Sequence, residues 1–215
     1  LYDSFLARLD PAGGLLCRKH FSGGYQLTHD HAPLPDGGVV LSGRFGWGVM
    51  DLGGGPILSE QSNGDHFIAR FDSGGQHLWS RRLRLSGDGF AWMWALSAGP
   101  GDALVIGGDC RGTVDLGGGP VACGDDENAA LLLVLDGAGQ HVWSRIFGGP
   151  GHHRTNGVAV DASGNIAVAG TFAGELDLGG GPLVYDGVYN DGFVAKLDPA
   201  GDHVFSVPFA TPVHD

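Results

Sequence analysis

Side chains that could do chemistry gather in three short clusters. Two histidines flank an aspartate in the first, two tryptophans lie close together in the second, and two histidines precede an arginine in the third: Thr28-His29-Asp30-His31, Trp92-Met93-Trp94 and His152-His153-Arg154. Imidazoles can bind a metal ion, and aromatic rings beside His and Arg donors can bind sugar rings or peptide side chains. The clusters therefore point to a metal centre or to a binding surface.

The histidine pairs could hold a divalent metal such as zinc. His29 and His31 are two residues apart, so on a regular strand they point the same way and Asp30 points opposite. Zinc needs three or four ligands, which His152 and His153 would help to complete. Trp92 and Trp94 lie between the two pairs along the chain, which weakens a shared site. We therefore favour histidines at variable loop positions and predict no cofactor.

Calcium is a second metal to consider, because an aspartate opens each copy of a repeated glycine-rich phrase. Asp51, Asp115 and Asp177 supply only one carboxylate per phrase, whereas calcium needs several converging oxygen ligands. A small hairpin, turned by the glycines and anchored by the following leucines, is the better interpretation.

Trp92 and Trp94 leave two interpretations open. They could form an aromatic platform for a ligand, or they could fill space where another repeat has Thr155 and Gly157. No Gly-x-Ser-x-Gly, His-Glu-x-x-His or Gly-Lys-Ser/Thr motif is present. The chain is thus predicted to be non-enzymatic. The alternative is a metal-dependent hydrolase or lyase using His29, His31, His152 and His153, with Asp30 or Arg154 assisting.

Composition narrows the class of partner. The chain has 12 Lys and Arg against 24 Asp and Glu, a net charge of −12. Nucleic acid and anionic membrane surfaces are therefore not expected partners. The longest apolar run, Ala129–Leu135, is too short to cross a bilayer, so membrane insertion is not expected either.

A repeated unit must position these clusters. The phrase Asp-Leu-Gly-Gly-Gly-Pro begins at Asp51, Asp115 and Asp177, at intervals of 64 and 62 residues. Glycine, with 41 residues, falls at repeated turn positions between apolar runs. In the clearest copy, Val158–Val160 pairs with Ile166–Phe172, and Phe193–Leu197 pairs with His203–Phe209, across Asp- and Gly-containing turns. Such a unit of four strands is typical of a β-propeller blade.

These motifs resemble a bacterial β-propeller repeat family. Its blades carry a Phe-Val-Ala-Lys-Leu-Asp-x-x-Gly strand pair and a Val-Asp-x-x-Gly-Asn hairpin, a pattern that Asp191–Gly201 and Val160–Gly170 follow. The resemblance covers essentially the whole chain, although the hairpin turns at 33–37 and 98–102 depart from it. It implies a secreted or cell-surface protein, often a seven-bladed ring, and a scaffold more than a chemistry.

Counting strands predicts an all-β, partial propeller domain over residues 1–215, with about three and a half blades of four antiparallel strands. A half blade is expected at 1–21 and complete blades at about 25–85, 90–147 and 155–209. Because this number cannot close a ring and leaves strand edges exposed, we expect the remaining blades of a longer propeller, or a partner, to complete it.

The connections between strands suggest which face binds. Short, stereotyped turns join the first strand to the second and the third to the fourth, whereas the other connections are long and vary most. Cys110 and Cys123 flank one long connection, where the next unit has Phe172 and Tyr185. This alignment predicts a disulfide and an oxidising compartment.

The leading hypothesis is thus an extracellular segment that binds a protein or carbohydrate ligand through the variable loops. Its candidate residues are Trp92, Trp94, His29, Asp30, His31, His152, His153 and Arg154. A further alternative is a structural spacer within a large surface protein.

Overall fold

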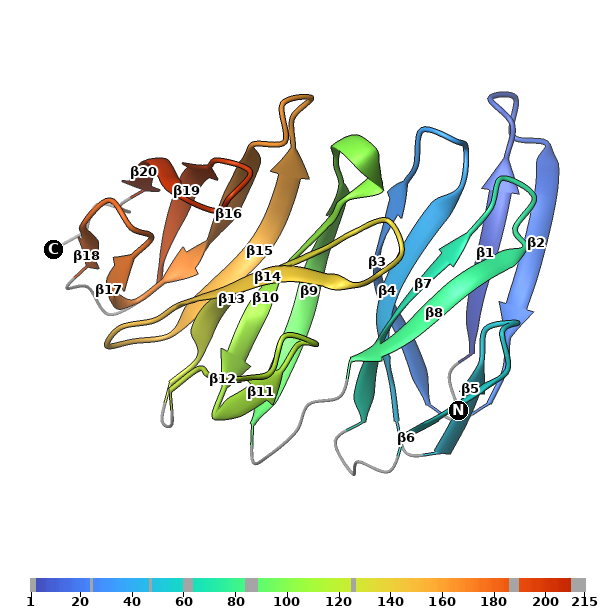
Figure 1. Ribbon diagram of the computed structural model, residues 1–215, viewed down its shortest axis with the longest axis horizontal. Helices are drawn as coiled ribbons and strands as arrows, with labels where there is room; N and C mark the ends of the chain where they lie inside the picture. Colours follow the sequence, from blue (N-terminus) through green and yellow to red (C-terminus); the bar gives the residue numbers. More distant parts are fainter. Residues whose placement is uncertain are drawn as a thin grey trace, which may run out of the picture. The chain divides into compact units, whose positions relative to one another are not determined.

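The protein is all-β, and its four-stranded sheets are antiparallel, as predicted (Figure 1). The computed structural model describes residues 3–23, 25–46, 48–59, 64–83, 89–124, 127–185 and 190–209. The chain divides into two compact units, residues 1–84 and 85–215. The expectation of one domain over residues 1–215 stays a prediction. Among the described residues the helical content is a 3-10 turn at Pro100–Asp102, and no helix is long and apolar enough to span a membrane.

Unit 1, residues 1–84, holds a two-stranded sheet, a four-stranded sheet and a small hairpin. The two-stranded sheet pairs β1 (Ser4–Leu9) with β2 (Leu15–Phe21). In order, the four-stranded sheet contains β3 (Gln26–Pro33), β4 (Val39–Phe45), β7 (Asp65–Phe71) and β8 (His77–Leu83). The hairpin of β5 (Gly48–Asp51) and β6 (Pro56–Ser59) lies in the connection from β4 to β7.

Unit 2, residues 85–215, repeats the four-stranded sheet and its hairpin twice. One sheet has the order β9 (Phe90–Ala98), β10 (Leu104–Arg111), β13 (Ala129–Leu135), β14 (His141–Phe147), with the hairpin of β11 (Thr113–Asp115) and β12 (Pro120–Ala122). The other has the order β15 (His153–Val160), β16 (Ile166–Phe172), β19 (Asp191–Leu197), β20 (His203–Phe209), with β17 (Gly174–Asp177) and β18 (Pro182–Tyr185).

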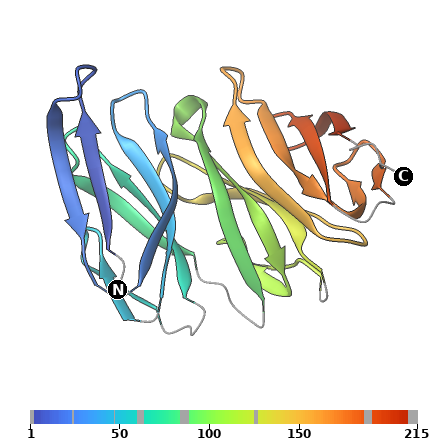
Figure 2. The same ribbon diagram turned by 180° about the vertical axis from the view of Figure 1, so that it is seen from behind.

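The two sheets of unit 2 lie face to face around a shared core, as the view from behind shows (Figure 2). Alternate residues of the strands supply this core: Val105, Leu132 and Val134 come from one sheet, and Val168, Phe172 and Phe193 from the other. The close approach is possible where Gly107 faces β15, because a Cβ atom there would lie 2.4 Å from Thr155 Cγ2. In unit 1, a separate cluster packs Phe21 of β2 against Leu41, Phe45 and Phe71.

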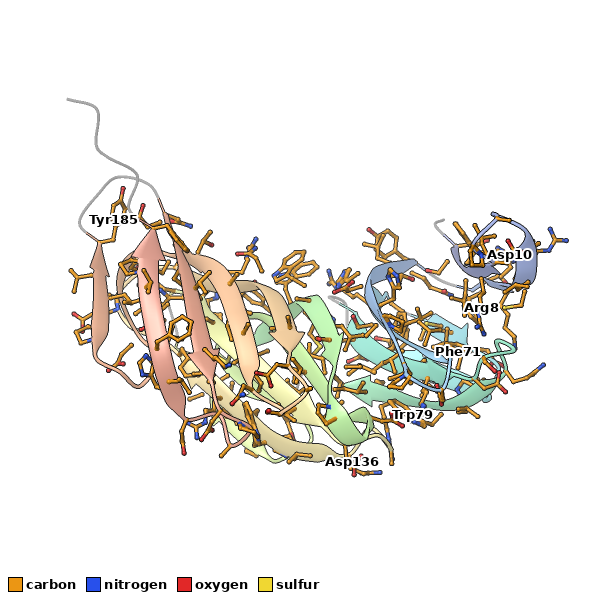
Figure 3. All side chains as sticks on the ribbon, turned by 90° about the horizontal axis from the view of Figure 1, so that it is seen from above. Arg8, Asp10, Phe71, Trp79, Asp136 and Tyr185 are labelled. Atoms are coloured by element: carbon orange, nitrogen blue, oxygen red, sulfur yellow. A yellow bond between two sulfur atoms is a disulfide. The ribbon has the colours of Figure 1, made fainter. Side chains whose placement is uncertain are left out.

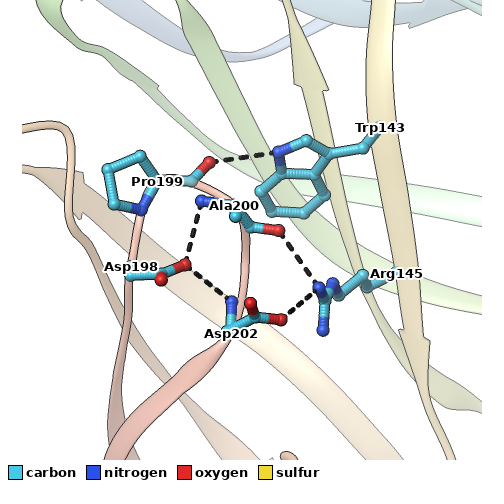
Figure 4. A network of polar contacts seen from close by, with 6 residues as sticks. All are labelled: Trp143, Arg145, Asp198, Pro199, Ala200 and Asp202. Carbon is cyan, nitrogen blue, oxygen red and sulfur yellow. Dashed lines mark hydrogen bonds and ion pairs between the residues drawn. The ribbon is translucent and has the colours of Figure 1, made fainter.

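An aspartate organises each turn between third and fourth strands. In these turns the Asp side chain accepts backbone N–H groups two and four residues later, at 2.7–2.9 Å (Asp10, Asp72, Asp136 and Asp198). Figure 4 shows the turn at Asp198 in contact with the neighbouring sheet: Arg145 donates to Asp202 at 2.7 Å, and Trp143 donates to the Pro199 carbonyl at 3.3 Å. Figure 3 labels Asp10, which lies in the turn between β1 and β2.

The Asp-Leu-Gly-Gly-Gly-Pro phrases form hairpins, as expected. In each, the Asp side chain accepts two glycine N–H groups, and the following leucine is buried (Leu52, Leu116 and Leu178). The middle glycine lies under a histidine that begins the fourth strand: a Cβ atom at Gly54, Gly118 or Gly180 would come within 2.3 Å of an imidazole atom of His77, His141 or His203. The recurring histidines are therefore packing partners of these turns.

A β-bulge interrupts the first strand of every four-stranded sheet. The register shifts at His29, Trp94 and Asn156, each of which is the extra residue of its strand. Opposite each bulge the second strand carries Gly43, Gly108 or Gly170. A Cβ atom on any of these glycines would lie 1.8–2.3 Å from a backbone oxygen of the first strand, so the glycine lets the bulge form.

Candidate functional site

The three bulges occupy equivalent positions and present different side chains. His29, Trp94 and Asn156 correspond to one another. The second-strand residues that follow the opposite glycines are Arg44, Asp109 and Thr171, and they pair in register with Leu27, Trp92 and Arg154. This register corrects the expected equivalents of the tryptophans: Trp92 corresponds to Arg154 and Trp94 to Asn156, not to Thr155 and Gly157. The prediction that His29 and His31 share a face assumed unbroken alternation, which the bulge at His29 removes.

The densest polar cluster surrounds Asp109 on β10. Asp109 has no exposed surface, yet it accepts three side-chain hydrogen bonds. The donors are Trp94 Nε1 at 2.5 Å, Asn128 Nδ2 at 2.7 Å and Arg154 Nε at 3.1 Å. They come from the bulge of β9, from the residue before β13, and from β15 of the second sheet. The cluster therefore links both sheets of unit 2.

Burial and pairing act on Asp109 in opposite directions. Desolvation raises the pKa of its carboxyl group above the ordinary value of 3.8, and the hydrogen bonds from Trp94 and Asn128 and the Arg154 charge only partly oppose this effect. A buried carboxylate is costly unless it is paired and hydrogen-bonded. Such a group, beside a cleft, is a recognised sign of a functional site.

Trp94 is held by its neighbours on more than one side. Its ring stacks on Trp92 with 5.3 Å between centroids and an interplanar angle of 14°. The Arg154 guanidinium carbon lies 4.8 Å from the centroid of the Trp94 ring. Both tryptophans are half-buried. Trp94 thus has a structural role in holding Asp109 and Arg154, in addition to any contact with a ligand.

His152, His153 and Arg154 are consecutive, and they do not share one environment. His153 is 1% exposed, and its Nε2 lies 3.2 Å from the Gly149 carbonyl oxygen. Burial lowers the pKa of His153, so the neutral imidazole is favoured. His152 is exposed and Arg154 is half-buried. Both line a cleft of about 290 Å³ together with Asn128, Thr171 and Asn190.

In unit 1, two histidines, His29 and His66, are in contact. The rings of His29 and His66 contact edge to face, with 5.6 Å between centroids, and the Asp30 carboxylate accepts the His31 backbone N–H at 2.8 Å. Within the described part of the chain, no three His, Cys, Asp or Glu side chains are grouped to hold a metal ion.

Cys110 and Cys123 form the predicted disulfide. It ties the end of β10 to the residue after β12. The equivalent residues of the second sheet, Phe172 and Tyr185, are in ring contact, with 6.5 Å between centroids; Figure 3 shows Tyr185 at the end of β18. The disulfide and the aromatic pair therefore hold equivalent hairpins against their sheets.

Sequence reasoning missed Asp109 and Asn128, the centre of the cluster. A signal for Asp109 was present, since an acidic residue interrupts the apolar run Leu104-Val-Ile-Gly-Gly-Asp-Cys110, and a buried charge in a strand requires partners. Asn128 gave no such signal, because it precedes its strand within a polar connection.

Comparisons with known proteins add little. No family model and no curated protein matches the chain. The chain is similar to a solved structure of a protein of unknown function from Bacteroides caccae, with 11% sequence identity and a TM-score of 0.43. The match covers 91% of this chain, which spans only 65% of that protein's length.

Proposed function

We propose that this protein is a non-enzymatic binding module that captures a protein or carbohydrate ligand at the end of the sheets where Trp92, Trp94 and Arg154 lie. The observation that carries the proposal is the cluster around Asp109. A carboxylate with no exposed surface is kept in place by three donors. It orders Trp94 and Arg154 beside an open cleft, and ordering side chains before binding reduces the entropic cost of association.

The proposed architecture is a β-propeller segment of the bacterial repeat family described above. Support comes from the three sheets with one strand order, one bulge position and one hairpin position. The disulfide favours a secreted or cell-surface location, because such bonds persist in oxidising compartments.

Further strands are proposed to complete the sheet of β1 and β2. In the described residues β1 pairs only with β2, whereas the corresponding strands β7, β13 and β19 each pair on both sides. Phe5 is 74% exposed, although its equivalents Phe67 and Phe193 are each 1% exposed. A buried Phe in those sheets lies under the bulge-facing glycine. This difference supports a neighbouring strand, from further blades or from a partner, over Phe5.

The binding proposal is tested by presenting the protein to a glycan array and to a panel of extracellular proteins. Trp92→Ala should abolish capture of whichever ligand binds, with little change in melting temperature. Phe205→Ala, which removes a 45% exposed ring on β20, is the matched control and should bind as the wild type does. Equal binding by wild type and Trp92→Ala would refute the proposed surface.

Adding a chelator to the same array tests whether capture depends on a metal ion. Capture should survive EDTA, since binding is proposed to use the protein's own side chains. Loss of capture on chelation, restored by zinc, would instead support the metal-dependent alternative built on His29, His31, His152 and His153.

A further inference from the structure

The cleft beside Arg154 is lined by polar residues. Asn128, His152, His153, Arg154, Thr171 and Asn190 surround about 290 Å³. Protein–protein interfaces have apolar cores and cover much larger areas. A small, polar hollow is better matched to one sugar unit, whose hydroxyl groups need hydrogen-bond partners.

Arg154 gives the cleft an oriented guanidinium group. Its Nε donates to Asp109 Oδ1 at 3.1 Å, and its planar group lies against the Trp94 ring. The side chain is 42% exposed. Among the described residues, the two terminal nitrogens of Arg154 have no hydrogen-bond partner. An arginine fixed through Nε can still offer both terminal nitrogens, side by side, to a planar carboxylate.

His152 adds a donor of defined direction. Its Nδ1 accepts the Asn128 backbone N–H at 3.3 Å. In the neutral imidazole, a ring nitrogen that accepts leaves the proton on the other nitrogen. The Nε2 atom of His152 is therefore a donor, and this side chain lines the same cleft.

Asn128 lines both this cleft and a larger neighbouring hollow. That hollow has a volume of about 600 Å³, and its lining includes Asn128, Glu127 and Gly149. A linear ligand could thus continue from one hollow into the other past Asn128.

We infer that this cleft binds the carboxylate of an acidic saccharide. The two terminal nitrogens of Arg154 donate to the two carboxylate oxygens, and His152 donates to the ligand from Nε2. The inference rests on the proposed binding function and names its ligand class. The sugar ring lies against the polar wall, and the neighbouring hollow takes the next unit of the chain.

The test is a calorimetric titration with trigalacturonate, with its fully methyl-esterified form as the matched neutral probe. The wild type should bind the acid, and the ester at least ten-fold more weakly. Arg154→Gln and Arg154→Lys should each weaken acid binding at least ten-fold, since lysine keeps the charge and loses the two-pronged geometry. His152→Ala, at an exposed position, should weaken it about three-fold.

Arg145→Gln is the control, because it removes the same charge from a turn contact away from this cleft and should bind as the wild type does. Equal affinity for acid and ester would overturn the carboxylate inference and leave carbohydrate binding intact. Equal losses in Arg145→Gln and Arg154→Gln, or competition by sulfate as strong as by galacturonate, would also overturn it. Failure of the proposed function is distinguishable, since Trp92→Ala would then match wild type on the array.

Discussion

The two sheets of unit 2 have the same backbone and different chemistry at two equivalent places. At the bulge, the first sheet pairs Trp94 with the buried Asp109, whereas the second pairs Asn156 with Thr171 at 3.4 Å. At the hairpin, the first sheet has the Cys110–Cys123 disulfide, whereas the second has the contact of Phe172 with Tyr185. The shared backbone is therefore set by glycines and turns, and the side chains at these two equivalent places differ between the sheets.

The largest expected effect tests the shared backbone. Gly108→Ala and Gly170→Ala should each destabilise the protein by about 3 kcal/mol or more, because a Cβ atom would lie within 2.0 Å of the Trp92 or Arg154 carbonyl oxygen. Urea denaturation measures the loss. Gly157→Ala is the control, since nothing lies within 4 Å of its Cβ position. A stable Gly108→Ala variant would show that the bulge does not depend on this glycine.

The hairpins should differ in their response to a reducing agent. Replacing both cysteines, Cys110→Ala and Cys123→Ala, removes a cross-link between residues separated by 13 positions, which corresponds to about 3 kcal/mol. Dithiothreitol should lower the melting temperature of the wild type and leave that of the double variant unchanged. Equal responses of the two proteins would show that the bond contributes no stability.

The two bulges should differ in how much the hydrogen-bonded pair at each one contributes to the free energy of unfolding. Trp94→Phe keeps a ring and removes the donor to a buried carboxylate, at a cost of about 2 kcal/mol. Thr171→Val removes a longer hydrogen bond between exposed groups, at a cost of about 0.5 kcal/mol. Paired urea titrations measure both. A larger loss in Thr171→Val would contradict the assignment of Asp109 as the centre of the cluster.

A further effect depends on pH and comes from Asp109 of the first sheet. Burial raises the pKa of Asp109 in the folded protein, so the folded state holds more protons than the unfolded state as pH rises from about 3.8. Stability should fall with pH across this window, by at most about 1.4 kcal/mol per pH unit. Asp109→Asn should lack this component, as the difference between wild-type and variant urea midpoints would show. A wild-type urea midpoint that rises with pH relative to that of Asp109→Asn would contradict the predicted loss of stability.

Local patterns in the sequence were sufficient to predict the strand pairs, the glycine-phrase hairpins and the disulfide. The hydrogen bonds that form the turns at Asp161 and Asp198 join residues close together in the sequence, so these turns can be predicted from the sequence. The bulges could not be found this way, because the glycine that permits each one is on a neighbouring strand. Asp109 required the same non-local information: its donors Asn128 and Arg154 are 19 and 45 residues away.

The glycine opposite each bulge also has a consequence for how such a chain changes. Because Gly43, Gly108 and Gly170 meet the geometric requirement of the bulge, the bulge does not require one particular side chain, and the three sheets have histidine, tryptophan and asparagine there. Each sheet thus has an exchangeable bulge position, whose side chain acts together with the second-strand residue that follows the opposite glycine. Ligand specificity could therefore be changed at one bulge position at a time. A residue pair such as Trp94 and Asp109 would be introduced at the equivalent positions of another sheet, with the backbone kept unchanged.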